Sequence, residues 1–294
     1  MQAHTIFQCV KCRSNRLSKI RSDLLCENCR CIFPIESHIP LLVSDLEGHE
    51  QSMAEARAVN PEWYLSEQSS ETISPWRHHL KKRRLYVSAV LRRELEKRGL
   101  VRAPRLLDLG CGDGTNLLWL RDLALSLYGS DYSLVRLARA RARSPDATLF
   151  LANILDYPAI DGCFDVVFFN HVIEHITDDR AALATAYRIL APGGVLVLGT
   201  PNEGAWWWQL AYKRAPEIRR TTDHVHFYTA DSIREKMQAA GFNVFEVKHM
   251  GWGPPDWHLD GQWRQHKWAD DLFEGVGRIL LPHQASSLYL LATK

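Results

Sequence analysis

The chain has 294 residues, of which 46% are hydrophobic and 24% are charged, and this composition is typical of a folded globular protein. The formal net charge of +2 is too small to indicate a nucleic acid or a membrane as the partner. No apolar run approaches ~20 residues and no charged-then-apolar signal pattern opens the chain, so we expect a cytoplasmic protein without a transmembrane helix.

Four of the seven cysteines form two Cys-x-x-Cys pairs near the N-terminus. The pairs are Cys9 with Cys12 and Cys26 with Cys29. This spacing is typical of four thiolates that hold one zinc ion, and the alternatives are unrelated thiols or a redox pair. A unit of ~40 residues rarely folds without such a staple. We therefore predict a structural zinc ribbon over residues 1–43, with Cys31 as a spare thiol.

The segment from Phe33 to Leu42 follows the second cysteine pair and reads Phe-Pro-Ile-Glu-Ser-His-Ile-Pro-Leu-Leu. It resembles the end of the small zinc-ribbon proteins that activate tRNA, rRNA and release-factor methyltransferases. A similar ribbon is fused to bacterial rRNA guanine methyltransferases. The resemblance implies that the ribbon recognises substrate or supports a catalytic domain and does no chemistry itself.

Residues 44–75 are polar, which predicts a linker with short helical pieces. Trp63 and Tyr64 are its only aromatic residues, and they either cover a ligand pocket or pack on the surface. A basic helix is expected over residues 76–98. A second basic helix face is formed by Arg136, Arg139, Arg141 and Arg143. Such faces bind a phosphate backbone, contact anionic lipid or glycan groups, or simply face water.

The stretch from Arg105 to Asn116 predicts a strand, a tight Gly-rich turn and a helix. Its glycines have Gly-x-Gly-x-Gly spacing, which differs from the Gly-x-Gly-x-x-Gly of dinucleotide sites. Glycines permit a sharp turn and close approach of a ligand, and the helix N-terminus favours polar or anionic groups. Asp108, on the strand before the turn, suits a ligand with a cationic amino group.

Predicted strands and helices alternate from residue 105 onward. The expected strands are 105–110, 125–130, 148–152, 164–169 and 194–199, and the helices between them are 116–123, 133–143 and 179–190. Two further strands, 242–250 and 287–293, close the chain. This alternation indicates an α/β fold with a parallel sheet, in which ligands bind at the carboxyl ends of the strands.

These motifs resemble those of class I S-adenosylmethionine (SAM) dependent methyltransferases, and Ala191-Pro192-Gly193-Gly194 is similar to the Lys-Pro-Gly-Gly turn of that family. The resemblance implies a Rossmann-like seven-stranded methyltransferase sheet, preceded by the zinc ribbon. It also implies SAM as cofactor, with Asp131 on the ribose and Asn170 near the methyl group. Asn153 stands where the family often carries Asp beside the adenine. The full set of implied cofactor residues is Asp108, Gly110, Cys111, Gly112, Gly114, Asp131, Tyr132, Asn153, Ile154 and Asn170.

A histidine-rich motif follows the fourth predicted strand. His171-x-x-Glu174-His175 matches the inverted zinc-protease pattern, but that pattern belongs to a long helix in a different fold. The motif also resembles the Glu-x-x-Glu-His of ubiquinone-pathway O-methyltransferases and of small-RNA 3′-end 2′-O-methyltransferases, with His171 in place of the first Glu. This resemblance implies either a second divalent metal near an acceptor hydroxyl or a metal-free scaffold in the acceptor pocket.

The segment from His224 to Thr229 resembles the His-x-x-x-Phe/Tyr-Thr segment that closes the acceptor pocket of ubiquinone-like O-methyltransferases. A histidine takes up a proton near neutral pH, so His224 or His226 is the candidate general base, and the sequence does not choose between them. The alternative interpretation is a helix start, with Thr229 as the N-cap of a helix over 233–240. The two interpretations are compatible.

Tryptophans are concentrated in the last third of the chain, at positions 206, 207, 208, 252, 257, 263 and 268. They line an apolar acceptor pocket, pack in the core or contact a membrane interface. Residues 204–220, where aromatic residues precede basic ones, resemble an amphipathic lid.

We therefore predict three parts: a zinc ribbon (1–43), a linker (44–75) and a SAM-dependent methyltransferase domain (76–294). The expected acceptor is a hydroxyl of a small-molecule, glycan or lipid intermediate. The candidate catalytic residues are His171, Glu174, His175, His224 and His226, with the base among His171, Glu174, His224 and His226. RNA is the alternative acceptor because of the ribbon and the basic helices, and a non-catalytic SAM-binding scaffold is the third interpretation. One structural zinc is expected, and peripheral membrane contact is a further alternative.

Overall fold

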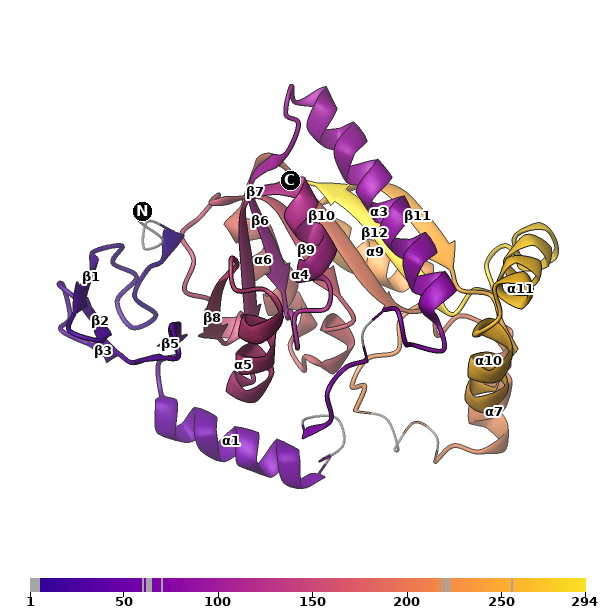
Figure 1. The fold of residues 1–294 in the computed structure, drawn as a ribbon, viewed down its shortest axis with the longest axis horizontal. Coiled ribbons are helices and arrows are strands. Elements are labelled where there is room, and N and C mark those ends of the chain that lie inside the picture. Colours follow the sequence, from indigo (N-terminus) through magenta and orange to yellow (C-terminus); the bar gives the residue numbers. More distant parts are fainter. Residues whose placement is uncertain are drawn as a thin grey trace. The chain divides into compact units, whose positions relative to one another are not determined.

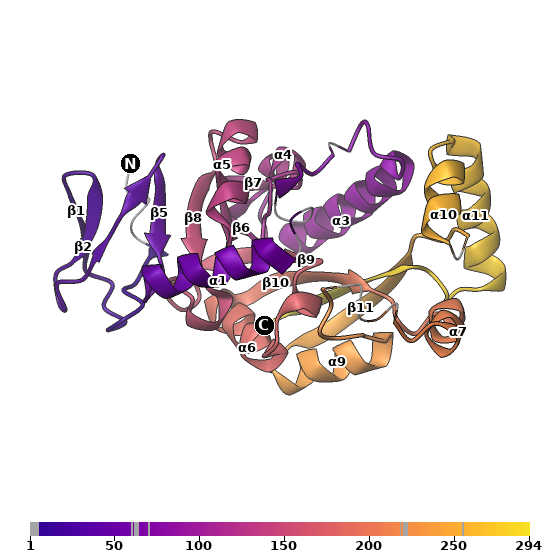
Figure 2. The same cartoon turned by 90° about the horizontal axis from the view of Figure 1, so that it is seen from below.

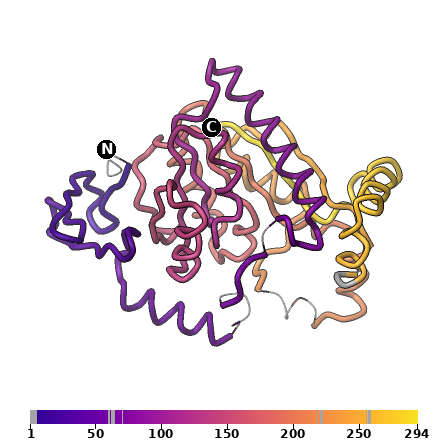
Figure 3. The backbone as a smooth tube through the Cα atoms, viewed as in Figure 1, coloured from indigo at the N-terminus to yellow at the C-terminus, as the bar shows by residue number. Residues whose placement is uncertain are grey.

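The computed structural model describes residues 6–59, 61, 65–69, 71–217, 219, 223–254 and 256–294, without the side chains of residues 257 and 258 (Figure 3). The chain forms two compact units. Unit 1 comprises Met1–Gln68, Gly99–Phe168 and Arg188–Gly194, and unit 2 comprises Ser69–Arg98, Phe169–Tyr187 and Val195–Lys294. The aromatic pair Trp63 and Tyr64, expected to cover a pocket or pack on the surface, lies outside the described residues.

Unit 1 begins with a small antiparallel sheet of β1 (Leu17–Ile20), β2 (Asp23–Cys26) and β3 (Ile32–Phe33). The two cysteine turns flank this sheet, and each has the same backbone form. Arg13 and Arg30, which directly follow the second cysteine of each pair, both have positive φ, of 59° and 65°. Their N–H groups donate to the carbonyls of Cys9 and Cys26. This repeated turn brings all four thiols to one place.

The ribbon continues into the larger sheet of unit 1. After β4 (Ile35–Glu36), strand β5 (Ile39–Leu42) runs parallel to β8 (Thr148–Ala152), with Leu41 opposite Leu151. Ile39 and Leu41 are buried in the same cluster as Leu149 and Leu151. The predicted linker then starts with a 14-residue helix, α1 (Leu46–Val59).

Parallel strands form the rest of the sheet in unit 1. Its order is β9 (Phe164–Asn170), β6 (Ala103–Leu109), β7 (Ala124–Asp131), β8 and β5, and neighbouring strands in this order pair parallel. Helices α4 (Leu117–Leu120) and α5 (Leu134–Arg143) connect these strands (Figure 1). Strands β8 and β9 are nearly continuous apolar runs, as strands buried on both faces require, whereas the first half of β7 is partly exposed. The predicted β/α alternation is confirmed here.

Unit 2 contains an antiparallel set of strands. β12 (Ser287–Thr293) lies between β10 (Leu190–Pro201) and β11 (Asn243–Met250) and pairs antiparallel with both. The helices of this unit are α3 (Arg77–Lys97), α6 (Asp179–Ile189), α7 (Trp206–Arg214), α9 (Ala230–Ala239), α10 (Trp257–Arg264) and α11 (Lys267–Leu280). Helix α9 packs along β11 (Figure 2). Thr229 is its N-cap, in a capping box with Ser232, as the sequence predicted.

Basic residues of α3 are bound within unit 2. Lys82 contacts Asp270, Asp271 and Glu274 at 2.7–2.8 Å. Arg93 contacts Glu246 of β11 at 3.1 Å. These ion pairs hold α3 and reduce the charge that its basic run offers to a polyanion. Within the described residues, no helix combines the length and the hydropathy needed to cross a membrane.

Candidate functional site

The Gly-rich turn joins β6 to α4 in unit 1. Gly110, Gly112 and Gly114 all have positive φ, of 79°, 53° and 78°. A Cβ atom at Gly114 would lie 2.9 Å from the Cβ of Ala140 on α5, so this position accepts only glycine without a shift of the helix. The N–H groups of Gly110 and Cys111 both donate to Ser130 O, which ties the turn to the end of β7. The backbone of the turn is therefore fixed by the end of β7.

Asp131 ends β7 and organises the same turn. Its two carboxylate oxygens accept hydrogen bonds from the N–H groups of Gly112 and Ser133, each at 2.8 Å. Burial raises the pKa of Asp131 above its ordinary value. Each oxygen keeps a second lone pair, so the carboxylate can still accept bonds from a diol. Tyr132 follows and packs edge-on against His49 of α1, with ring centroids 4.2 Å apart.

Asp113 lies inside the turn and is fully buried. It contacts Arg136 and Arg139 of α5 at 3.4 and 3.6 Å and accepts the N–H of Gln68 at 2.8 Å. On the same helix, Arg141 donates to the carbonyls of Pro145 and Ala147, and Arg143 donates to the carbonyl of Gln68. All four arginines of the second basic face have partners inside unit 1, which leaves little of that face for a phosphate backbone.

The side chains of three expected cofactor residues, Cys111, Asn153 and Ile154, make contacts within the protein. The side chain of Cys111 is buried in the core, so only its backbone faces the turn. Asn153 accepts the N–H of Leu155 at 2.9 Å and thereby caps the short helical turn Ile154–Asp156. Its amide nitrogen is still a donor for a ligand. Ile154 is half-buried at the start of that turn.

Asn170 is the last residue of β9 and belongs to unit 2. Its Oδ1 atom is buried and has no hydrogen-bond partner among the described residues. It packs directly against Gly199 of β10. A buried acceptor of this kind costs stability unless a donor binds to it, so Asn170 fits a ligand that brings an N–H group.

Glu174 is the centre of the histidine-rich motif in unit 2. Its side chain is 1% exposed, with Oε1 lying 3.2 Å from Nδ1 of His171 and Oε2 accepting from Thr200 Oγ1 at 3.3 Å. The residue His171 has φ 53°, a strained value that turns its side chain towards this carboxylate. Burial pushes the pKa of Glu174 up, but the hydrogen bond from His171 and the charges of His171 and His175 outweigh burial and hold it below its ordinary value.

His175 lies between two acids. Its Nδ1 atom is 3.3 Å from Asp223 Oδ2, and its Nε2 atom is 4.0 Å from Glu174 Oε1. Burial lowers the pKa of His175, but the hydrogen bond to Asp223 and the charge of Glu174 reverse the direction and raise it. His175 is therefore stabilised as a cation.

His224 packs edge-on against His175, with ring centroids 4.9 Å apart. Burial and the neighbouring charge of His175 lower the pKa of His224, although Glu174 and Asp223 pull the other way. Its Nδ1 atom lies 4.0 Å from Glu203, a buried acid that accepts the hydroxyl of Tyr212. One ligand atom from each of Glu174, His175 and His224 lies within 4.8 Å of the others.

His226, the other candidate base, is directed elsewhere. Its Nε2 atom lies 3.1 Å from Thr177 O and 3.8 Å from Asp179 Oδ2. Its ring stacks on Tyr228, whose hydroxyl donates to Asp179. The structure therefore brings His171, Glu174, His175 and His224 together and leaves His226 outside that group.

Three residues of this cluster were not predicted from the sequence: Thr200, Glu203 and Asp223. Asp223 directly precedes His224, and Thr200 and Glu203 flank the end of β10. The sequence did contain signals for these residues. One was an acid next to a candidate histidine, and the other was a pair of polar residues at the end of a predicted strand.

The four cysteines of the ribbon form a second candidate centre. The Sγ atoms of Cys9 and Cys29, and those of Cys12 and Cys26, are 3.5 Å apart, and all four lie within 4.8 Å of one another. Four sulfurs at ~2.3 Å from a tetrahedral zinc ion would be ~3.8 Å apart, so the cluster fits one zinc with small adjustments.

Comparisons with known proteins agree with this geometry. A family described as a methyltransferase domain matches residues 76–247. A "Probable S-adenosylmethionine-dependent methyltransferase" of Mycolicibacterium smegmatis is 30% identical over 139 residues, which are 47% of this chain and 52% of that protein. A ubiquinone biosynthesis O-methyltransferase of Cereibacter sphaeroides is 31% identical over 162 residues, which are 52% of this chain and 66% of that protein. The matches thus span about half to two thirds of these relatives.

Among solved structures, a chain from the complex of the Haloferax volcanii Trm112 methyltransferase activator with a methyltransferase aligns with a TM-score of 0.53 and 19% identity. The alignment covers 83% of this chain and 96% of that chain. At this identity the likeness concerns the fold. It confirms the predicted class I methyltransferase fold, and strands β6 to β12 match the seven strands expected.

Proposed function

The chain belongs to the methyltransferase-domain family, and we propose that it transfers a methyl group from SAM to a hydroxyl of a small-molecule, glycan or lipid acceptor. The observation that carries the acceptor chemistry is the contact of His224 with His175 beside the buried Glu174. A neutral imidazole next to a held cation is suited to remove a proton from a hydroxyl.

The Gly-rich turn and Asp131 support SAM as the cofactor. The glycines at positive φ leave the backbone open to close approach, and Asp131 keeps lone pairs for the two ribose hydroxyls. Asp108, which is 1% exposed at the end of β6, suits the cationic amino group of the methionine part. Asn170 offers its buried Oδ1 to a donor. SAM supplies an activated methyl group on a positively charged sulfur.

In the proposed reaction His224 accepts the proton of the acceptor hydroxyl as its oxygen forms a bond to the methyl carbon. The bond between this carbon and the sulfur breaks, and its electron pair stays on the sulfur. Burial and the charge of His175, whose cationic form Asp223 and Glu174 favour, lower the pKa of His224 and so favour its neutral imidazole. His171 and Thr200 position Glu174. Positioning of two reactants contributes ~7–11 kcal/mol in such systems.

A metal-assisted version is the alternative for this site. Glu174, His175 and His224 offer one carboxylate oxygen and two ring nitrogens within reach of one ion, a donor set that suits a borderline divalent ion better than Mg²⁺. We favour the metal-free version because His175 is already paired with two acids. Activity that survives prolonged dialysis against a chelator supports it, and loss of activity that returns with Mn²⁺ or Zn²⁺ favours the metal.

We further propose that residues 1–43 bind one structural zinc and support the methyltransferase domain through β5. The parallel pairing of β5 with β8 supports this role, because removal of β5 would expose a sheet edge.

RNA is the alternative acceptor, and the sequence favoured it partly because of the basic face of α5. The structure weakens that argument, since all four arginines of this face are bound within unit 1. The third interpretation, a non-catalytic SAM-binding scaffold, predicts binding without turnover.

The direct test is transfer of labelled methyl from SAM into fractionated cell extract. Label in the small-molecule, lipid or glycan fraction supports the proposal, and label in RNA contradicts it. His224→Gln should lower kcat by ~10²–10⁴-fold with SAM affinity retained, because a general base contributes that much. His226→Gln is the matched control and should lower kcat less than tenfold. Equal effects of the two substitutions would refute the assignment of the base.

A further inference from the structure

Helix α11 buries an acid, Asp270, on the same side as Ala269 and Gly277. Asp270 is 1% exposed and contacts Lys82 of α3 at 2.7 Å and Arg264 of α10 at 2.8 Å. Lys82 also contacts Asp271 and Glu274 of α11, each at 2.8 Å. A surface helix of a folded domain normally buries its apolar stripe, whereas α11 is anchored by these ion pairs and leaves most of its large apolar side chains exposed.

The opposite side of α11 is apolar and exposed. We call it the outward face and define it by Trp268, Leu272, Val276 and Ile279, whose exposed fractions are 60%, 53%, 45% and 80%. At 100° per residue these four side chains lie within an arc of about 80°, centred roughly opposite Asp270. Trp263 of α10, also exposed, packs edge-on against Trp268 with ring centroids 5.9 Å apart. Figure 2 shows α10 and α11 side by side.

Ion pairs hold α11 in the orientation that exposes its apolar side. The polar face of α11 is held by Lys82 and Arg264, and the indole of Trp76 donates to Asp260 of α10 at 2.5 Å. Rotating α11 to bury its apolar side would break the pairs of Asp270 with Lys82 and Arg264. A large apolar patch that stays exposed in the folded protein is typical of an interaction surface.

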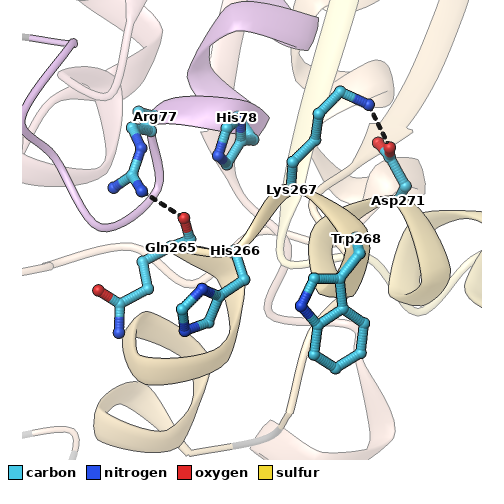
Figure 4. A pocket seen from close by; sticks show the side chains of 7 residues that line it. All are labelled: Arg77, His78, Gln265, His266, Lys267, Trp268 and Asp271. Carbon is cyan, nitrogen blue, oxygen red and sulfur yellow. Dashed lines mark hydrogen bonds and ion pairs between the residues drawn. The ribbon is translucent and has the colours of Figure 1, made fainter.

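Basic side chains border the outward face. An open pocket of about 560 Å³ beside Trp268 is lined by Arg77, His78, Gln265, His266, Lys267, Trp268 and Asp271 (Figure 4). Arg77 donates to the carbonyl of Gln265 at 2.5 Å, and this partner is uncharged. The one acid, Asp271, is shared between Lys267 and Lys82. The first turn of α3, which carries Arg77, has no acid.

We propose that the outward face of α11 binds the surface of a membrane that contains anionic lipids. Leu, Ile and Val side chains would enter the outer acyl region, and Trp263 and Trp268 would lie at the head groups, where tryptophan is enriched. The basic pocket lining would face the phosphates. A second copy of the chain fits less well, because a two-fold interface would bring the basic border of one copy towards the same border of the other. The proposal does not rest on the methyl-transfer reaction.

The test is flotation of the full-length chain with vesicles of phosphatidylcholine and phosphatidylglycerol, compared with vesicles of phosphatidylcholine alone. We expect binding to the anionic vesicles that weakens as salt is raised. The double variant Leu272→Gln/Ile279→Gln should reduce the bound fraction at least about tenfold, because two apolar side chains lose their burial. Lys267→Gln should weaken binding about fivefold, the contribution of one surface cation.

The matched control is Val101→Gln/Leu125→Gln, which changes two exposed apolar residues of unit 1, 87% and 63% exposed. It should bind vesicles as the unchanged chain does. All variants alter exposed side chains, so circular dichroism and melting curves should show the same fold. Absence of vesicle binding by the unchanged chain overturns the proposal. So does a dimer in light scattering that Leu272→Gln/Ile279→Gln converts to a monomer, since the face would then join two copies.

Discussion

The side chain of Asn170 occupies the space in which a Cβ atom of residue 199 would lie. An alanine at Gly199 would overlap Asn170 Oδ1 and approach the ring of Tyr289 within 2.8 Å. Asn170 would have to move, and with it the buried acceptor that we assign to the cofactor. We expect Gly199→Ala to lower SAM affinity at least about tenfold and to destabilise the fold by ~1–3 kcal/mol through overpacking. Isothermal titration calorimetry and urea unfolding measure the two effects.

Gly275→Ala is the control for this substitution. Gly275 is in helix α11, and a Cβ atom there meets nothing within 4 Å. Alanine is the better helix former by ~1 kcal/mol, so this variant should be slightly more stable and bind SAM unchanged. An unaltered SAM affinity in Gly199→Ala would show that Asn170 does not contact the cofactor.

The pH dependence of activity follows from His224. Burial and the charge of His175 lower its pKa, so it stays neutral below the ordinary titration range of histidine. A protonated imidazole cannot accept a proton, and activity is therefore lost as the pH falls through this lowered pKa. We expect the acid limb of the kcat profile to have its midpoint below the ordinary pKa of histidine. A midpoint above that value would contradict His224 as the base.

Asp223→Asn tests the cation at His175. The hydrogen bond to Asp223 raises the pKa of His175, so its loss lowers that pKa. His175 would then deprotonate at a lower pH, and the alkaline limb of the kcat profile should move in the acid direction. The pH profiles of the two proteins, together with the imidazole signals in NMR titrations, measure the shift. An unmoved alkaline limb would show that the charge of His175 is not needed for turnover.

Zinc should be bound by the four clustered cysteines. Mass spectrometry of the purified protein is expected to find one zinc per chain. Cys26→Ser should lose the metal and lower the melting temperature, because Leu24, Leu25 and Phe33 depend on the ribbon for burial. Cys31→Ser, outside the cluster, should keep both the zinc and the melting temperature. A chain that contains no zinc would remove the ribbon's proposed role.

Asp113 should contribute strongly to stability without touching substrate. Asp113→Asn removes the charge opposite Arg136 and Arg139 in a buried site, and breaking such a pair costs ~3–5 kcal/mol. Urea unfolding measures the loss. Asp122→Asn is the control. It changes an exposed acid, and the free energy of unfolding should change by less than ~0.5 kcal/mol. A loss below ~1 kcal/mol in Asp113→Asn would mean that water screens the pair.

Much of the fold could be predicted because its signals are local. The strand runs from β6 to β10, the N-cap at Thr229 and the spacing of the four cysteines each depend on residues a few positions apart. Periodicity, helix capping and turn chemistry act over that range. They can therefore be recognised in the sequence without knowledge of tertiary contacts. The Gly-rich turn and the end of β9, which hold the expected cofactor residues, were found in the same way.

Only the tertiary structure distinguishes the surroundings of His224 from those of His226, and our proposal of His224 as the base rests on that difference. The two residues are separated by one position, yet one ring packs on His175 and the other on Tyr228. Other contacts are equally distant in the sequence. They include the contacts of the histidine cluster with Glu203 and Asp223, the ion pair of Asp113 with α5, and the ion pair of Asp270 in α11 with α3. Burial and charge neighbours set these pKa values and exposures, and the sequence alone does not specify which distant residues become neighbours.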